Sequence, residues 1–263
     1  MIDEESEKKQ MEPTNGHRSV RLCGVRVDDL TLSEAVEDAL RERGAPCWVV
    51  TPNAVILDAC SRDARLGVML GHALLSLPDG AGVIRAARRI GAPLRERIAG
   101  IDFGEALLAR AAEEGLRVFL LGGGAGVAER AAERLCARYP ALRICGCCWG
   151  FFEKEGETDR SVIEHVRATR PDILLVCMGF PLQETWIESH LHLLDGVRVV
   201  AGLGGSLDVW AGDLRRAPRL VSRVGLEWAW RMAREPRRLR QLPAILRCAI
   251  GWRGDLAGDR IKK

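Results

Sequence analysis

The most constraining feature of this 263-residue sequence is a regular alternation of short apolar runs with segments of helical periodicity. The apolar runs cover residues 47–51, 73–77, 117–122, 142–147, 172–178 and 197–203. The segments of helical periodicity lie near residues 31–43, 53–70, 80–91, 102–115, 125–139, 158–169 and 182–194. Several runs are uniformly apolar, as is typical of strands buried on both faces of a parallel sheet. The alternation therefore predicts an α/β fold in which a Rossmann-like, mostly parallel sheet carries helices on both faces.

The alternation occupies only part of the chain, so we expect three segments. Residues 1–19 are polar and contain Pro13 and Gly16, which is typical of a flexible leader. Residues 20–213 hold the alternation and form the α/β domain. Residues 214–263 carry apolar residues at helical spacing among many arginines. They predict a basic, amphipathic helical appendage that Pro236 and Pro243 divide into short helices.

The net charge of +3 conceals an uneven distribution. Residues 214–263 hold 14 Arg or Lys and four acidic residues, a balance of +10, which leaves −7 for residues 1–213. The small overall charge argues against a dedicated nucleic-acid-binding protein, and no apolar stretch reaches the roughly 18–20 residues that span a bilayer. Nine scattered cysteines and an N-terminus without a signal-peptide core predict a cytoplasmic protein.

Ligands of open α/β sheets bind beyond the carboxyl ends of the strands, so the loops that follow the apolar runs are the candidate sites. Thr51-Pro52-Asn53 follows the first run and opens a helix, where Thr51 or Asn53 caps the helix or presents its amides to an anion. Asp79 follows the second run and is either a helix cap or a general base. The sequence alone leaves these choices open.

Three later loops follow apolar runs in the same way. The turn that contains Gly122 and Gly124 either cradles a phosphate or is a tight turn without a ligand. It is not a dinucleotide-binding fingerprint, because Val127 stands where that motif has its third glycine. Gln183 and Glu184 begin a helix, where they read a base or a ribose or are simply surface helix formers. The segment Gly204-Gly205-Ser206-Leu207-Asp208 follows the last run.

No metal site is expected. Cys145 and Cys148 form a C-x-x-C pair, but no second pair or nearby histidine completes a zinc site, and the segment is typical of a buried strand. The five histidines do not cluster, and no D-x-D triplet is present to hold a divalent ion on a nucleotide sugar.

Taken together, the order and spacing of these segments resemble the WecG/TagA/CpsF family of bacterial glycosyltransferases (glycosyltransferase family 26), from about Val20 to Arg238. The resemblance rests on Thr51-Pro52-Asn53, Pro78-Asp79-Gly80, residues 97–102, residues 179–184, residues 204–208, Arg216-Ala217-Pro218 and residues 225–228. Two positions depart from the family pattern. Trp149-Gly150-Phe151-Phe152 stands where His-Gly-Tyr-Phe is frequent, and Leu182 stands where a lysine commonly precedes the Gln-Glu pair.

The resemblance implies an activity. Family members transfer an N-acetylmannosamine-type sugar from its UDP donor to undecaprenyl-diphosphate-linked N-acetylglucosamine, with inversion and without a metal or other cofactor, to build teichoic acid or other surface polysaccharides. It implies that Asp79 is the general base, that Thr51 and Asn53 line the catalytic site, and that Arg97 binds substrate. With the loop positions and the basic appendage, the expected substrate-binding residues are Arg97, Asp102, Gly122, Gly124, Gln183, Glu184, Gly204, Gly205, Ser206, Asp208, Arg216, Arg219 and Arg223.

The chemistry of transfer agrees with these roles. A base must take the proton of the acceptor hydroxyl, and positive charge must stabilise the departing diphosphate. Without a metal, that charge comes from Arg97, from helix N-terminal amides, or from appendage arginines that include Arg215. The appendage cations and Trp228, Trp230 and Trp252 suit an anionic membrane surface, so we expect a protein peripherally attached to the inner face of the cell membrane.

Other interpretations remain open at this point. A family member with another donor, such as UDP-glucose, fits the same motifs. A nucleotide-dependent oxidoreductase fits the sheet, and an adaptor that docks its basic tail on a membrane or a nucleic acid fits the charge distribution. Nucleic acid is not an expected partner because no recognition motif is present, and a homo-oligomer is compatible with the sequence.

Overall fold

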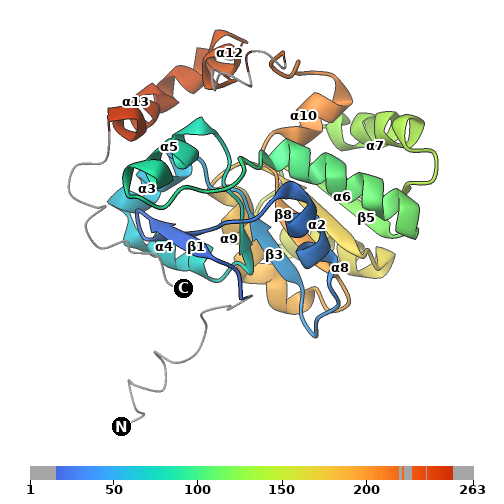
Figure 1. Cartoon of the computed structure of the whole chain (residues 1–263). Coiled ribbons are helices and arrows are strands. Elements are labelled where there is room, and N and C mark those ends of the chain that lie inside the picture. Colours follow the sequence, from blue (N-terminus) through green and yellow to red (C-terminus); the bar gives the residue numbers. More distant parts are fainter. Residues whose placement is uncertain (1–15, 219–220, 222–226, 235, 251–263) are drawn as a thin grey trace.

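The computed structural model describes residues 16–218, 221, 227–234 and 236–250 (Figure 1). Its strands are β1 (Ser19–Leu22), β2 (Val25–Asp28), β3 (Cys47–Val50), β4 (Leu75–Ser76), β5 (Arg117–Gly122), β6 (Arg143–Cys148), β7 (Ile173–Cys177) and β8 (Val199–Gly202). Its helices up to residue 211 are α2 (Leu32–Leu40), α3 (Ala54–Arg62), α4 (Ala64–Gly71), α5 (Ala81–Arg89), α6 (Gly100–Glu114), α7 (Val127–Arg138), α8 (Gly156–Thr169), α9 (Leu182–His190), η1 (Leu191–Leu193) and α10 (Ser206–Ala211). The basic segment that follows contains α12 (Glu227–Arg234), η2 (Pro236–Gln241) and α13 (Leu242–Ile250).

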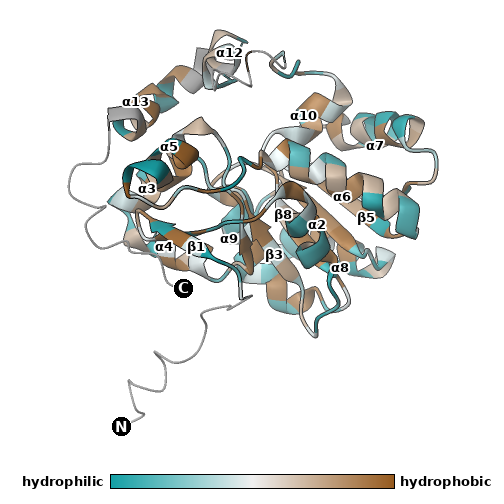
Figure 2. Cartoon of the chain, viewed as in Figure 1, coloured by the Kyte–Doolittle hydropathy of each residue, from teal (hydrophilic) through white to brown (hydrophobic). Residues whose placement is uncertain are grey.

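Six parallel strands form the central sheet in the order β4-β3-β8-β7-β5-β6. Helices α2, α6, α7 and α10 cover one face, and α3, α4, α5, α8 and α9 cover the other. The side chains of each strand alternate between the two cores, so Trp48 joins one core and Val49 the other. Figure 2 shows the strands as largely hydrophobic, with hydrophilic residues on the outer helices. The expected α/β fold is confirmed.

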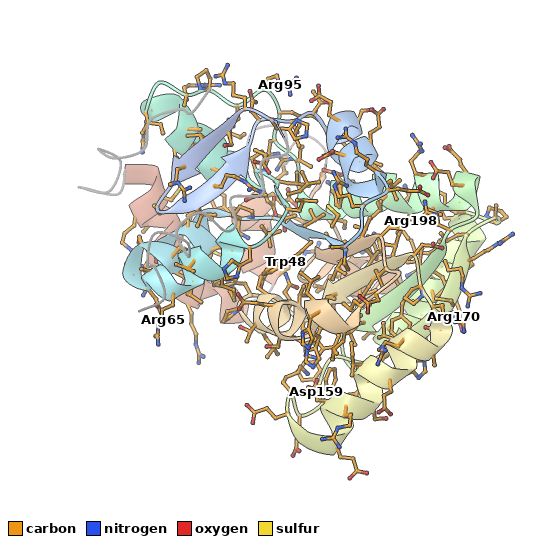
Figure 3. The ribbon with its side chains drawn as sticks, turned by 90° about the horizontal axis from the view of Figure 1, so that it is seen from below. Trp48, Arg65, Arg95, Asp159, Arg170 and Arg198 are labelled. Atoms are coloured by element: carbon orange, nitrogen blue, oxygen red, sulfur yellow. The ribbon has the colours of Figure 1, made fainter. Side chains whose placement is uncertain are left out.

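Trp48 illustrates how deeply this sheet is covered. Its side chain is 1% exposed and lies in the interior in Figure 3, whereas Arg65 and Arg170 project from the periphery. The edge strand β6 is different, because five of its six residues are only half-buried. The sequence pattern indicated a buried strand around Cys145 and Cys148, and the position at the sheet edge explains the difference.

A hairpin precedes the sheet and was not among the expected elements. Strands β1 and β2 pair antiparallel through a turn at Cys23 and Gly24, both of which have positive φ. The hairpin contributes apolar side chains to the core beside α4 and α5. Charged residues interrupt the apolar ones in both strands, so they do not form uniformly apolar runs, which is why the alternation did not reveal them.

The basic segment lies against the rest of the chain. Figure 1 shows α12 and α13 arching over one end of the α/β domain, and α13 contacts α3 and α5. Ala244 and Cys248 are buried there, and Gly82 allows the approach because a Cβ at that glycine would lie 2.8 Å from Sγ of Cys248. Pro236 begins η2 as expected. Pro243 instead occupies the first turn of α13, where a proline is tolerated because the first helical N–H groups have no partner within the helix.

Candidate active site

A cavity of about 870 Å³ lies between the carboxyl end of the sheet and the basic segment. Four neighbouring strands supply its floor through the loops that follow β4, β3, β8 and β7. Helices α12 and α13 supply Trp228, Met232, Ile245 and Leu246 to the opposite wall. Because the loops come from adjacent strands, residues separated by more than 120 positions meet in one place.

Nine of the expected site residues line this cavity. They are Thr51, Asn53, Asp79, Arg97, Gln183, Gly204, Gly205, Ser206 and Arg216. Asp102, Gly122, Gly124, Glu184 and Asp208 do not line it. Arg219 and Arg223 lie outside the described residues.

The loop of Asp79 is held by backbone hydrogen bonds from two sides. The amide of Asp79 donates to the carbonyl of Pro52 at 3.1 Å, and the amide of Ile98 donates to the carbonyl of Pro78 at 2.9 Å. Gly80, the N-cap residue that precedes α5, has φ +91°, a conformation that a side chain would strain. The segments around residues 52, 79 and 98 are thereby fixed to one another, which positions the carboxylate of Asp79 at the cavity wall.

Thr51 and Asn53 have different local functions. Asn53 caps α3, and its Oδ1 accepts from the amides of Val55 at 3.0 Å and Ile56 at 3.2 Å. This leaves the amide nitrogen of Asn53 as its donor toward the cavity. Thr51 is 7% exposed and its hydroxyl donates to the carbonyl of Gly202 at 3.3 Å, so it ties the end of β3 to the end of β8.

Several helices begin at the cavity. Helices α5, α6 and α10 start at its lining without a side-chain cap hydrogen bond. Their first N–H groups and helix dipoles favour negative charge at that position. Gly100 lets α6 start close to β3, since a Cβ there would lie 3.2 Å from Oγ1 of Thr51.

The charged lining is predominantly positive. It contains Arg85, Arg97, Arg215, Arg216 and Arg234 against Asp79, Asp213 and Glu227. Arg85, Asp213, Arg234 and Glu227 were not expected from the sequence. Arg85 lies on α5, whereas Arg234 and Glu227 reach the cavity because α12 lies over the loops. A cluster of guanidinium groups near helix N-termini suits a diphosphate.

Two of these arginines link the basic segment to the α/β domain. Nη1 of Arg97 lies 3.2 Å from Oε2 of Glu227, which begins α12. Nη2 of Arg216 lies 2.6 Å from Oδ1 of Asp102, in the first turn of α6. Asp102 therefore holds a cavity arginine instead of lining the cavity itself.

Gln183 and Glu184 are both buried, so the interpretation as surface helix formers is wrong. Gln183 is 3% exposed, and its Oε1 accepts from the amides of Gly179 at 3.1 Å and Gly204 at 2.9 Å. Its Nε2 donates to Oε1 of Glu184 at 2.8 Å. Glu184 is 1% exposed, and burial raises its pKa to about 7. The carboxyl of Glu184 thus lies beneath the cavity floor and not in it.

The glycine-rich turn after β5 packs closely against the neighbouring backbone. Gly122 has φ +140°, and a Cβ on it would run into the carbonyl oxygen of Cys177. The amide of Gly123 donates to that same carbonyl at 3.1 Å, and the amide of Gly150 donates to the carbonyl of Gly123 at 2.9 Å. The turn lies beyond the four strands that line the cavity because β5 and β6 occupy the far side of the sheet.

Neither a metal site nor a spanning helix is found in the part of the chain that the structure describes. Within these residues, no three His, Cys, Asp or Glu side chains gather in a way that could hold a metal ion. None of the described helices has the length and apolar character needed to cross a membrane.

Comparison with known proteins gives this cavity its context. The model of the Glycosyl transferase WecG/TagA/CpsF family matches residues 20–256. The chain belongs to this family, and it is a glycosyltransferase. This membership excludes the oxidoreductase and adaptor interpretations.

Two relatives are named for the same activity. The chain is 34% identical over 210 residues, 80% of each protein, to the N-acetylglucosaminyldiphosphoundecaprenol N-acetyl-beta-D-mannosaminyltransferase of Bacillus spizizenii strain W23. It is 31% identical to the protein of the same name from Staphylococcus aureus strain MW2. That alignment spans 239 residues, which are 89% of this chain and 92% of the relative.

Proposed function

We propose that this glycosyltransferase moves N-acetylmannosamine from a UDP donor to undecaprenyl-diphosphate-linked N-acetylglucosamine in the synthesis of a cell-surface polymer. The observation that carries this proposal is the cavity, in which Asp79, at the carboxyl end of the sheet, lies in a lining with five arginines and several helix N-termini. The names of the relatives supply the sugar and the acceptor.

The reaction needs few groups from the protein. A hydroxyl oxygen of the acceptor sugar attacks the anomeric carbon, and the bond from that carbon to the diphosphate oxygen breaks. The carboxylate of Asp79 takes the hydroxyl proton, while Arg97 and the helix N-termini stabilise the negative charge on departing UDP. Attack opposite the leaving group inverts the anomeric centre, and the proposed step uses no metal.

Substitution of Asp79 tests this mechanism. Asp79→Asn removes the base but keeps the side-chain size, so we expect the turnover number for transfer to fall by about 10²- to 10⁴-fold while UDP affinity stays within threefold of wild type. Asp213→Asn is the matched control because Asp213 is a second aspartate of the cavity lining, pairs with Arg130 and has no part in the proposed step. Near-normal turnover by Asp79→Asn would remove Asp79 from the mechanism.

A donor panel tests the sugar. With a short-chain lipid-diphosphate acceptor, UDP-N-acetylmannosamine is expected to give the highest kcat/KM, above UDP-N-acetylglucosamine and UDP-glucose. Higher kcat/KM with UDP-glucose would replace the proposed donor. Turnover that persists after treatment with a chelator is expected from a site without a metal.

We also propose that the basic segment attaches the enzyme to an anionic membrane surface, where the lipid-linked acceptor lies. Although α13 packs on the α/β domain, Trp228, Leu239 and Leu246 are 38%, 55% and 47% exposed. Arginines on the same helices are exposed as well, among them Arg234 and Arg240. Exposed apolar side chains among cations favour binding at an anionic lipid interface.

Two tests address the membrane proposal. Leu239→Glu should weaken binding to vesicles that contain anionic lipid, whereas Val68→Glu, at a 63% exposed position of α4, should not. Truncation after Gly212 should abolish vesicle binding and severely reduce transfer, because it also removes one wall of the cavity. Equal vesicle binding by wild type, Leu239→Glu and the truncated chain would refute the attachment.

A further inference from the structure

The pair Gln183 and Glu184 joins two loops of the cavity from below. Oε1 of Gln183 accepts from the amide of Gly179, after β7, and from the amide of Gly204, after β8. Both glycines line the cavity, and the two strands are hydrogen-bonded neighbours. One side-chain oxygen therefore fixes the distance between two loops that belong to different strands.

A side-chain amide can make these bonds in one orientation only. If it were flipped, the NH₂ group of Gln183 would face the N–H groups of Gly179 and Gly204, and three donors would meet. Oε1 of Glu184 accepts from Nε2 of Gln183 at 2.8 Å and so selects the orientation that bonds both loops. The carboxyl of Glu184 thus acts on the loops through Gln183.

The backbone makes room for this pair. A Cβ at Gly202 would lie 2.8 Å from Nε2 of Gln183 and 3.4 Å from Oε1 of Glu184. The carbonyl of the same glycine accepts from the hydroxyl of Thr51. The pair, Gly202 and Thr51 form one connected layer at the floor of the cavity, which Gln183 and Thr51 line.

Packing alone does not account for a carboxyl at this position. Glu184 is 1% exposed, and its Oε2 has no hydrogen-bond partner among the described residues. A buried polar atom without a partner destabilises a fold, and an apolar side chain of the same length avoids that cost. Burial also raises the pKa of Glu184 to about 7, in keeping with a carboxyl whose charge is poorly solvated.

We propose that Glu184 is a positioning residue that orients the amide of Gln183 and thereby holds the Gly179 and Gly204 loops in the geometry that sugar transfer requires. This inference rests on the proposed function of the cavity. Glu184 touches neither substrate in this arrangement, which agrees with its place outside the cavity lining.

Two variants of the full-length protein separate positioning from packing. Glu184→Gln keeps a carbonyl oxygen that can accept from Nε2 of Gln183, whereas Glu184→Met fills the same space without an acceptor. We expect Glu184→Met to lower kcat/KM for transfer by about 10- to 100-fold, as small displacements in an active site do, without lowering the midpoint of thermal unfolding. Glu184→Gln should stay within threefold of wild type.

Hydrogen exchange gives a readout that does not depend on activity. Amide exchange at Gly179 and Gly204 should be at least tenfold faster in Glu184→Met than in wild type or Glu184→Gln. Unchanged exchange at both glycines, or faster exchange with wild-type kcat/KM, would overturn the proposal. If Glu184→Met fails to fold, Gln183→Leu takes its place in both measurements. The proposal would be overturned if Gln183→Leu had the same kcat/KM and the same amide exchange as wild type. Absence of transfer by the wild type would refute the proposed function, and exchange would then still decide whether Glu184 holds the loops.

Discussion

The ion pair between Arg97 and Glu227 predicts competition between the basic segment and the donor for one cation. Arg97 lines the cavity and was expected to bind substrate, yet in the structure its Nη1 lies 3.2 Å from Oε2 of Glu227. A diphosphate that binds this guanidinium has to displace the carboxylate of Glu227. Glu227→Gln should therefore strengthen UDP binding.

The magnitude follows from the geometry. At 3.2 Å and an effective dielectric constant of about 20, the gross attraction between the charges is about 5 kcal/mol. The two side chains are 24% and 20% exposed, so solvation of the separated groups offsets most of this attraction. A net value of about 1 kcal/mol remains for a pair of this kind, which corresponds to about a fivefold decrease in the Kd for UDP.

Calorimetric titration with UDP of wild type, Glu227→Gln, Arg97→Met and the double variant tests this competition. Glu227→Gln should lower Kd about fivefold in the wild-type background and leave it unchanged in the Arg97→Met background. Glu113→Gln is the control, because Glu113 is 71% exposed, pairs with Arg110 and does not line the cavity. Weaker UDP binding by Glu227→Gln, or the same change in both backgrounds, would refute the reasoning.

Three further variants test the packing around the site. Gly122→Ala should lower the free energy of unfolding by about 3 kcal/mol or more, because the new Cβ would collide with the carbonyl of Cys177. A urea titration curve that matches wild type would contradict this prediction. Burial raises the pKa of Glu184 from 4.5 to about 7 in the folded chain, so the folded state binds more protons than the unfolded state between these pH values. The free energy of unfolding therefore falls as the pH rises from 4.5 to about 7. In Glu184→Gln, urea unfolding measured at several pH values should lack this fall. Arg247→Met removes the hydrogen bonds of 2.6 and 2.8 Å to the buried carboxylate of Asp58. Limited proteolysis should therefore cleave α13 faster than in wild type. An unchanged cleavage rate would mean that other contacts hold this helix.

The periodicity of the sequence predicted the sheet because six short apolar runs, several of them uniformly apolar, carry a strong signal. The same signal could not predict the strand order, which depends on how the layers pack. Strand order decides which loops meet, and it separates the turn at Gly122 from the loops of Asp79 and Gly204. The burial of Glu184 was missed for a related reason, since a glutamate in the first turn of a helix usually faces solvent.

The uneven charge distribution also stabilises the contact between the basic segment and residues 1–213. The −7 of residues 1–213 includes Asp58 and Asp102, which pair with Arg247 and Arg216 of the basic segment. Some arginines of the basic segment, whose net charge is +10, thus hold the segment over the cavity through ion pairs, and the remaining cations are available to lipid. Because a strongly anionic membrane can compete with Asp58 and Asp102 for Arg247 and Arg216, it would pull the segment from the cavity, and moderate anionic lipid content should give the highest transfer rate. Transfer that rises steadily with anionic lipid content would indicate that membrane binding and docking use separate cations.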